Sequence, residues 1–284
     1  MANQARSYAD YLKVPELLAL QRCLSEPPEH DETLFIVVHQ VYELWFKLML
    51  LEVDTIIARM TAGEARQAAR LFRRLHEIQQ VLIRQVAVLE TMAPQDFLRF
   101  RDHLKPASGF QSYQFRELEF ASGLKDPRYL EAYREEPELG ARLRARLEEP
   151  SLADAWEALL RRRGCDYPEL PPEAPEQERL RRRSRRIEAL LSIYADTNRH
   201  HDLYCLAEAM IQYDENLSLW RWHHVRMVER MIGMKQGTGG SEGVGYLQTT
   251  LGKRCFPELW KLRTHLGDGG FNGEGGDPAP EALG

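Results

Sequence analysis

The chain has 284 residues, 43% of them hydrophobic and 29% charged, which is the composition of a globular protein with one large domain or two modest ones. The formal net charge is -5, so no basic excess favours nucleic acid as a partner. The N-terminus has no apolar core of a secretory signal, and the apolar stretch from Thr33 to Tyr42 is too short to span a bilayer. We therefore expect a cytoplasmic protein with no membrane partner.

The four cysteines are scattered singly along the chain, at Cys23, Cys165, Cys205 and Cys255. No CxxC pair occurs, so the sequence suggests neither a zinc ribbon nor a disulfide framework.

Helical patterns dominate the first third of the chain. Residues 8–23 read as one amphipathic helix, which Pro15 opens. Asp31 and Glu32 favour a helix N-terminus, and residues 33–60, which follow, are apolar almost all round, which predicts a buried helix. Gly63 marks a turn, and another long helix is expected from Glu64 to Met92.

Further helices are predicted beyond Pro94, which ends this helix or starts a short one, and beyond a loop at 106–110. Residues 126–163 are rich in Glu, Arg and Leu and predict surface helices, and the Arg-rich run 179–186 predicts a solvated helix face. A proline-rich linker at 165–177 precedes that run. The Gly- and Pro-rich tail 267–284 is expected to be disordered.

The linker could mark a domain boundary, but the apolar helix faces on its two sides need each other. We therefore predict one all-α domain over residues 1–266, a helical bundle with a small helical insertion at about 126–186.

One helix after the linker carries a histidine on its apolar side. Helical spacing places His224 on one stripe with four apolar residues, Leu217, Trp220, Met227 and Met231. His223 lies about 100° away around the helix and shares its face with arginines, so His224 is expected to face inward. A lone buried histidine is more often hydrogen-bonded core than ligand, although an apolar stripe around it also suits a haem iron.

The helix runs into the glycine-rich loop GTGGSEGVG at 237–245. The loop has neither the GxGxxG fingerprint nor the GK[ST] of a phosphate loop, and a helix rather than a strand precedes it. Its GxSxG letters, with Ser241 central, are discounted for the same reason. It can be a simple helix cap, or a backbone that closes over a ligand and presents the Thr238 hydroxyl.

Two other segments carry candidate binding residues. His39 shares a helical stripe with Phe35, which predicts either core packing or an aromatic wall for a planar ligand with one N–H. Arg101 could pair with a surface carboxylate or grip a ligand carboxylate with two parallel hydrogen bonds. Ser108 follows in the 106–110 loop and could donate to a ligand.

These segments together resemble the tryptophan 2,3-dioxygenase family. The matching stretches are LSEPPEHDETLFIVVHQVYELWFKL, FRDHLKPASGFQSYQFRELEF and LWRWHHVRMVERMIGMKQGTGGSEGVGYL. The resemblance runs from about Tyr8 to Arg263 and is weakest from about Lys125 to Arg186. It implies an all-α homotetramer containing haem b, which inserts both atoms of O₂ across the indole C2–C3 bond of L-tryptophan. The product is N-formyl-L-kynurenine, the first intermediate of kynurenine-pathway catabolism.

The resemblance also implies roles for single residues. His224 matches the proximal ligand of the haem iron, and His39 matches the distal histidine that bonds the indole N–H. Arg101 matches the residue that binds the substrate carboxylate, and Thr238 matches a contact to the ammonium and carboxylate end. The other implied contacts are Phe35, Ile36, Val37, Val38 and Phe97 around the substrate, Ser108 near substrate and haem, and Tyr8 and Tyr11 reaching a neighbouring subunit's site from a swapped helix 8–23.

Position 97 is Phe here, whereas relatives can carry Tyr, so Arg101 is expected to bear more of the carboxylate binding. Three other interpretations remain open. One is a haem-dependent indole-processing relative with a different substrate preference, the second is a non-enzymatic haem or gas sensor, and the third is a helical scaffold without a cofactor.

Overall fold

The computed structural model describes residues 7–239 and 243–267. These residues form α-helices and three short 3-10 helices, and no strand occurs among them, so the all-α prediction is confirmed. The α-helices are α1 (Tyr8–Leu12), α2 (Val14–Leu17), α3 (His30–Thr61), α4 (Ala65–Leu89), α5 (Pro94–Arg101), α6 (Tyr113–Ser122), α7 (Pro137–Glu148), α8 (Leu152–Arg162), α9 (Glu176–Ala195), α10 (His201–Ile232), α11 (Val244–Thr249) and α12 (Pro257–His265). The 3-10 helices are η1 (Asp102–Leu104), η2 (Gly109–Gln111) and η3 (Pro127–Tyr133).

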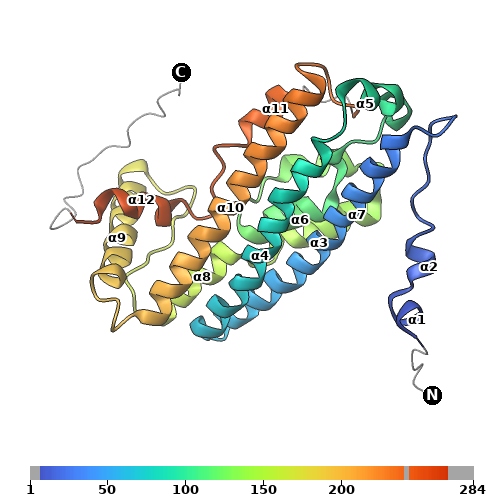
Figure 1. Cartoon of the computed structure of the whole chain (residues 1–284). Coiled ribbons are helices and arrows are strands. Elements are labelled where there is room, and N and C mark those ends of the chain that lie inside the picture. The colour runs from blue at the N-terminus through green and yellow to red at the C-terminus, as the bar shows by residue number, and fades with distance from the viewer. Residues whose placement is uncertain (1–6, 240–242, 268–284) are drawn as a thin grey trace.

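The long helices α3, α4 and α10 make the body of the molecule (Figure 1). α4 packs along both of the others, while α6 and α8 pack on a further side of α3. The largest cluster of buried apolar side chains joins all five of these helices. α3 and α10 both pack mainly against α4 rather than against each other. This arrangement leaves space for a cavity between α3 and α10.

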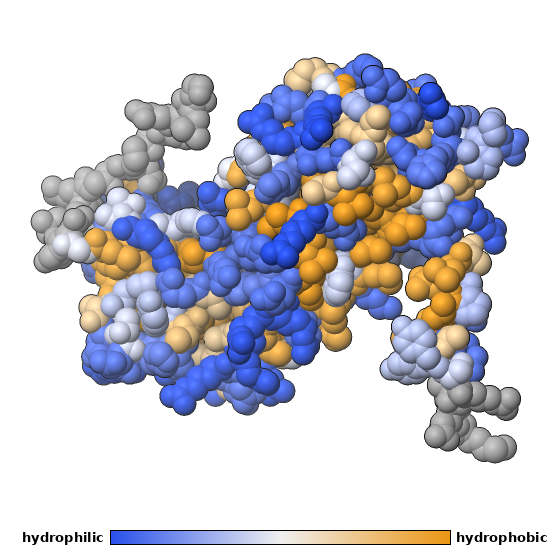
Figure 2. Space-filling model, in the orientation of Figure 1, coloured by the Kyte–Doolittle hydropathy of each residue, from blue (hydrophilic) through white to orange (hydrophobic). Residues whose placement is uncertain are grey.

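The α3 helix begins and ends where the sequence predicts. Asp31 and Glu32 lie in its first turn, and Gly63 follows its end with a φ of +86°, which few side chains tolerate. The helix is not buried all round, however. Val37, Leu44 and Leu51 are 41%, 53% and 62% exposed, because they repeat every seven residues on a face that this single chain does not cover. Figure 2 shows apolar surface where α3 and α4 run.

Length and composition alone would let α3 cross a membrane. In this structure its other faces pack against α4, α6 and α8 instead, as those of a core helix do.

The N-terminal segment differs from the single helix predicted over 8–23. It forms two short helices, α1 and α2, separated at Lys13, whose φ is +54°. Neither helix buries a residue, and the second ends at Leu17. Helices this short are marginal without tertiary packing, so an apolar period alone did not extend the helix to Cys23. The segment projects from the body of the chain (Figure 1).

The region from 126 to 186 is only partly a surface insertion. α8 packs against α3 and buries Trp156 and Leu159, so it belongs to the core. Arg186, in the run predicted to be solvated, is 2% exposed and forms an ion pair with Glu157 at 2.7 Å. Its guanidinium lies 4.5 Å from the ring centre of Tyr167, in the proline-rich linker. The tail predicted to be disordered lies outside the described residues, except for Gly267.

A buried carboxylate fastens the C-terminal segment to the helix that carries His224. Asp214 on α10 is fully buried and accepts hydrogen bonds from the backbone N–H groups of Cys255 and Phe256. It also accepts one from the indole N–H of Trp260 at 2.8 Å. These bonds set the position of α12 against α10 and α9.

Replacing this carboxylate should destabilise the fold strongly. Asp214→Ala leaves two buried backbone N–H groups and one half-buried indole N–H without an acceptor, which should lower the free energy of unfolding by on the order of 3–5 kcal/mol. Trp260→Phe is the matched control, because it removes only one donor and should cost about 1 kcal/mol beyond the change in packing. Urea denaturation measures both. Equal stability of the two variants would contradict this account of Asp214.

Candidate active site

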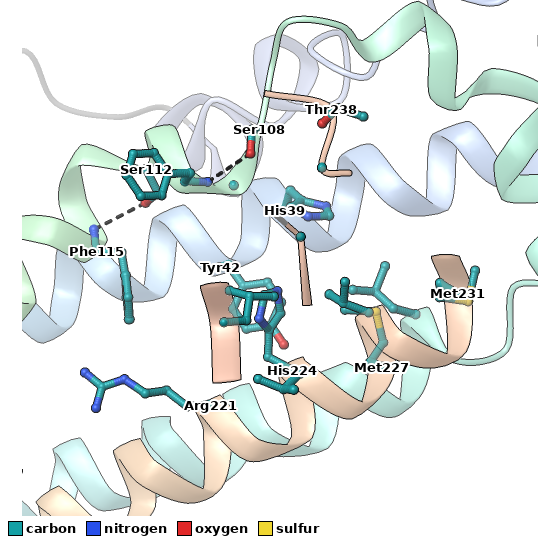
Figure 3. A pocket seen from close by; sticks show the side chains of 18 of the residues that line it. His39, Tyr42, Ser108, Ser112, Phe115, Arg221, His224, Met227, Met231 and Thr238 are labelled. Carbon is teal, nitrogen blue, oxygen red and sulfur yellow. Dashed lines mark hydrogen bonds between the residues drawn. The ribbon is translucent and has the colours of Figure 1, made fainter. Parts of the chain in front are cut away.

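A largely apolar cavity of about 260 Å³ lies between α3 and α10. α6, α11 and the loops that follow α5 and α10 complete its walls. Figure 3 shows His39 on one side of it and His224 on the other. The predicted site residues that line it are Phe35, His39, Phe97, Arg101, Ser108, His224 and Thr238.

The His39 side chain has a fixed tautomer. Its Nδ1 lies 2.7 Å from the carbonyl oxygen of Phe35, one helical turn back. A carbonyl only accepts, so Nδ1 carries the proton and Nε2 is left as an acceptor. Burial lowers the pKa of His39, which keeps the ring neutral near pH 7. His39 is therefore prepared to accept one hydrogen bond from a ligand N–H.

His224 lies on α10 and, unlike His223, lines the cavity, as the helical spacing predicts. Burial, with a smaller contribution from the charge of His39, lowers the pKa of His224 to about 4. Its ring stacks on Trp220, with centroids 5.4 Å apart and an interplanar angle of 11°. A neutral, oriented imidazole facing an apolar cavity is the form that ligates a metal.

The glycine loop approaches the 106–110 loop closely. The Thr238 hydroxyl donates to the carbonyl of Ala107 at 2.6 Å. A Cβ on Gly239 would lie 2.6 Å from the Cβ of Ser108, so only glycine permits this approach. With its proton engaged, the Thr238 oxygen is left as an acceptor for a ligand donor.

The Arg101 side chain reaches across to the loop after α10. One Nη donates to the carbonyl of Gln236, and Nε is buried without a hydrogen-bond partner among the described residues. A buried N–H without an acceptor is costly, which favours an anionic ligand beside Arg101.

Some implied substrate contacts are not brought to this cavity. Ile36, Val37 and Val38 do not line it, because successive residues of α3 point about 100° apart. The carbonyl of Val38 instead accepts from Gln85 on α4. Tyr8 and Tyr11, on the projecting α1, are 77% and 75% exposed and do not line the cavity of their own chain.

Sequence reasoning missed a buried charged cluster at the cavity wall. Glu119 bonds Arg116 on the same helix and Arg221 on α10, the latter at 2.9 Å. All three line the cavity and are at most 6% exposed. Arg221 precedes His224 by three residues, so it lies on nearly the same helix face, and that spacing was the available signal.

The chain is similar to known proteins that share one name. A family model described as Tryptophan 2,3-dioxygenase matches residues 1–168 and 174–266. The protein from Nocardioides sp. named Tryptophan 2,3-dioxygenase is 48% identical over 265 residues, covering 92% of this chain and 94% of its own. Proteins of the same name from Caulobacter vibrioides and Myxococcus xanthus are 44% and 40% identical, covering 93% and 92% of this chain and 99% and 89% of their own.

The chain belongs to the tryptophan 2,3-dioxygenase family. The match spans the cavity-lining segments on α3, α5, α6 and α10 as well as the loops between them.

The cavity of this family member fits a haem by its unpaired polar atoms. Nε of Arg116, Nε and Nη1 of Arg221, and Nε1 of Trp220 are all buried N–H groups without a partner among the described residues. All three side chains line the cavity, where two arginines share the single carboxylate of Glu119. The unpartnered N–H donors of these side chains suit the carboxylates of a haem beside the His224 imidazole.

The buried histidines predict a pH dependence of stability in the haem-free protein. Because folding lowers the pKa of His224 from 6.5 to about 4, the unfolded chain binds more protons between those values. The free energy of unfolding should therefore fall as pH drops from 6.5 toward 4. At about 1.4 kcal/mol per unit, His224 contributes on the order of 2–3 kcal/mol to this loss.

His224→Leu should flatten this pH profile, as measured by urea denaturation at a series of pH values. His223→Leu is the control one residue away, outside the cavity lining. Identical profiles for the two variants would show that His224 is not held neutral by its surroundings.

Proposed function

We propose that the protein is a haem-dependent dioxygenase that inserts both atoms of O₂ across the indole C2–C3 bond of L-tryptophan. The product is N-formyl-L-kynurenine, and the reaction opens the kynurenine pathway. One observation carries the proposal: His39, Arg101 and His224, far apart in the sequence, line a single cavity in a member of this family.

His224 would hold the haem iron as its proximal ligand, since its imidazole is neutral and kept in orientation by Trp220. Arg116 and Arg221 would hold the haem carboxylates, with the indole N–H of Trp220 as a further donor lining the cavity. Haem b with ferrous iron supplies the centre at which O₂ is activated.

The opposite wall would orient the indole ring. The Nε2 acceptor of His39 takes the hydrogen bond of the indole N–H, while the rings of Phe35 and Phe97 form an apolar wall beside it. The centroids of Phe35 and His39 are 4.0 Å apart, so Phe35 also limits the motion of the imidazole. Orientation places one edge of the indole toward the reacting oxygen, which is a large part of the rate enhancement.

The two loops would bind the amino-acid end of the substrate. Arg101 pairs with the carboxylate, and no tyrosine phenol at position 97 shares that task. Thr238 accepts from the ammonium group, and the Ser108 hydroxyl is left to donate, since its oxygen accepts hydrogen bonds from backbone N–H groups of η2. The close contact of the glycine loop with the 106–110 loop excludes water from the reacting end.

The assembly we propose is a cytoplasmic homotetramer. Its support is the projecting N-terminal segment, where Tyr8, Tyr11 and Leu18 are more than two-thirds exposed (Figure 1). These side chains need a partner surface, and a neighbouring subunit's cavity entrance would cover the tyrosines. The open apolar stripe of α3 adds further surface for subunit contact.

The experiment that tests the proposed function supplies tryptophan and O₂ to purified protein reconstituted with haem under reducing conditions. N-formylkynurenine should form and should require haem, tryptophan and O₂ together. A protein that binds haem but forms no N-formylkynurenine would overturn the enzymatic proposal and favour a haem sensor.

The ligand assignment predicts that His224→Ala abolishes stable haem retention. The alanine would remove the imidazole that would bind the haem iron while the rest of the cavity stays in place. Haem content after gel filtration measures the effect, and His223→Ala is the matched control that should retain haem. Equal haem content in the two variants would contradict the assignment.

If Arg101 binds the substrate carboxylate, Arg101→Ala should mainly raise KM for tryptophan. The expected loss of substrate binding free energy is on the order of 2–5 kcal/mol. Tryptamine has no carboxylate, so its turnover should change far less, which separates a lost ion pair from a disturbed loop. Arg99→Ala is the control on the same helix, with a side chain 62% exposed. A similar loss for both substrates would contradict the assignment.

A further inference from the structure

The region where the family resemblance is weakest places one aromatic residue directly behind the cavity wall. Tyr129 lies in η3 and is 8% exposed. The Arg116 guanidinium carbon lies 4.1 Å from the centre of its ring, closer than to the rings of Phe110 at 5.1 Å or Phe115 at 5.4 Å. Tyr129 does not itself line the cavity, but its ring limits where Arg116 can lie.

The hydroxyl of Tyr129 joins two further segments. Tyr246 on α11 donates its O–H to this oxygen at 3.0 Å, and the Lys253 ammonium donates to it at 2.6 Å. Tyr246 lines the cavity, and its helix α11 directly follows the glycine loop. One phenol oxygen therefore connects η3, α11 and the turn after α11.

Packing alone does not account for this arrangement. Tyr129 belongs to a small apolar cluster with Phe120, Tyr133 and Leu143, where a phenylalanine ring would fill the same space. In that cluster the hydroxyl of Tyr133 is buried without a hydrogen-bond partner among the described residues. The two tyrosines lie in the same cluster, but the Tyr129 oxygen accepts two hydrogen bonds and the Tyr133 oxygen accepts none from the described residues.

We propose that Tyr129 is a positioning residue for haem retention. Its ring holds Arg116 in the place from which that guanidinium meets the anionic edge of the cofactor, and its hydroxyl fixes the Tyr246 side chain in the cavity wall. The inference rests on the proposed function, and it adds a role for the start of the 126–186 region: η3 supports the cavity wall and ties it to the helix after the glycine loop.

The test compares Tyr129→Phe with Tyr133→Phe in the haem-reconstituted full chain. The measurement is the rate at which haem transfers from each holoprotein to excess apomyoglobin, which does not depend on turnover. Tyr129→Phe should lose haem about tenfold faster than the wild type, because hydrogen bonds to a charged donor are lost. Tyr133→Phe should stay within about twofold of the wild type, because its hydroxyl has no partner to lose.

Tyr246→Phe provides a second variant that leaves η3 intact. Tyr246→Phe should also speed haem loss. For the double variant with Tyr129→Phe, the fold-increase in the rate of haem loss should be smaller than the product of the two single fold-increases, because both substitutions remove the same hydrogen bond. Equal rates for Tyr129→Phe and Tyr133→Phe would overturn the positioning role while leaving the proposed function standing. A wild-type protein that takes up no haem would overturn both.

Discussion

The site depends on two long helices that share one neighbour. α3 and α10 both pack along α4, and the space left between them is the cavity. Each helix directs one histidine into it, and burial keeps both imidazoles neutral by disfavouring their charged forms. A neutral imidazole on each side gives one wall suited to an iron ion and the other suited to a ligand N–H. The rest of the molecule keeps these walls at a fixed separation.

Different charged and polar groups lie at the two ends of the cavity, so the two ends suit different ligand groups. Arg116 and Arg221 share one carboxylate and keep unpaired N–H groups, so their part of the wall favours anionic groups. Arg101 and Thr238 offer a cation and a hydroxyl acceptor elsewhere, on the loops, and Figure 3 shows Arg221 and Thr238 at different ends of the cavity. A flat apolar cofactor with carboxylates and an amino acid with an indole ring can therefore lie together without competing for the same cation.

Much of this arrangement follows from local sequence patterns. Helical spacing was enough to distinguish His224 from His223 and to place His39 with Phe35, because 3.6 residues per turn fixes which side chains share a face. The turn at Gly63 and the start of α3 followed from equally local chemistry. The resemblance supplied what spacing could not, namely that these two histidines and Arg101 belong to one site.

Other features depend on contacts between distant segments and could not be predicted from the sequence. Arg186 was predicted to be solvated, and the burial of Arg116 and Glu119 was not predicted, because it depends on partners from other helices or on a ring behind them. The N-terminal helix was predicted too long because its apolar face has nothing to pack against in this chain. Trp156 shows the opposite error. Its charge-rich segment was predicted to form surface helices, but its helix α8 packs on α3 and buries this side chain.

In the proposed reaction, both atoms of O₂ are transferred to one tryptophan molecule bound in this cavity. Mass spectrometry can follow their fate in the N-formylkynurenine formed by the haem-reconstituted protein under ¹⁸O₂ in unlabelled water, quenched before the carbonyl oxygens exchange. Both newly introduced oxygen atoms should carry the label. A product with a single labelled oxygen, the other coming from water, would contradict the proposed reaction.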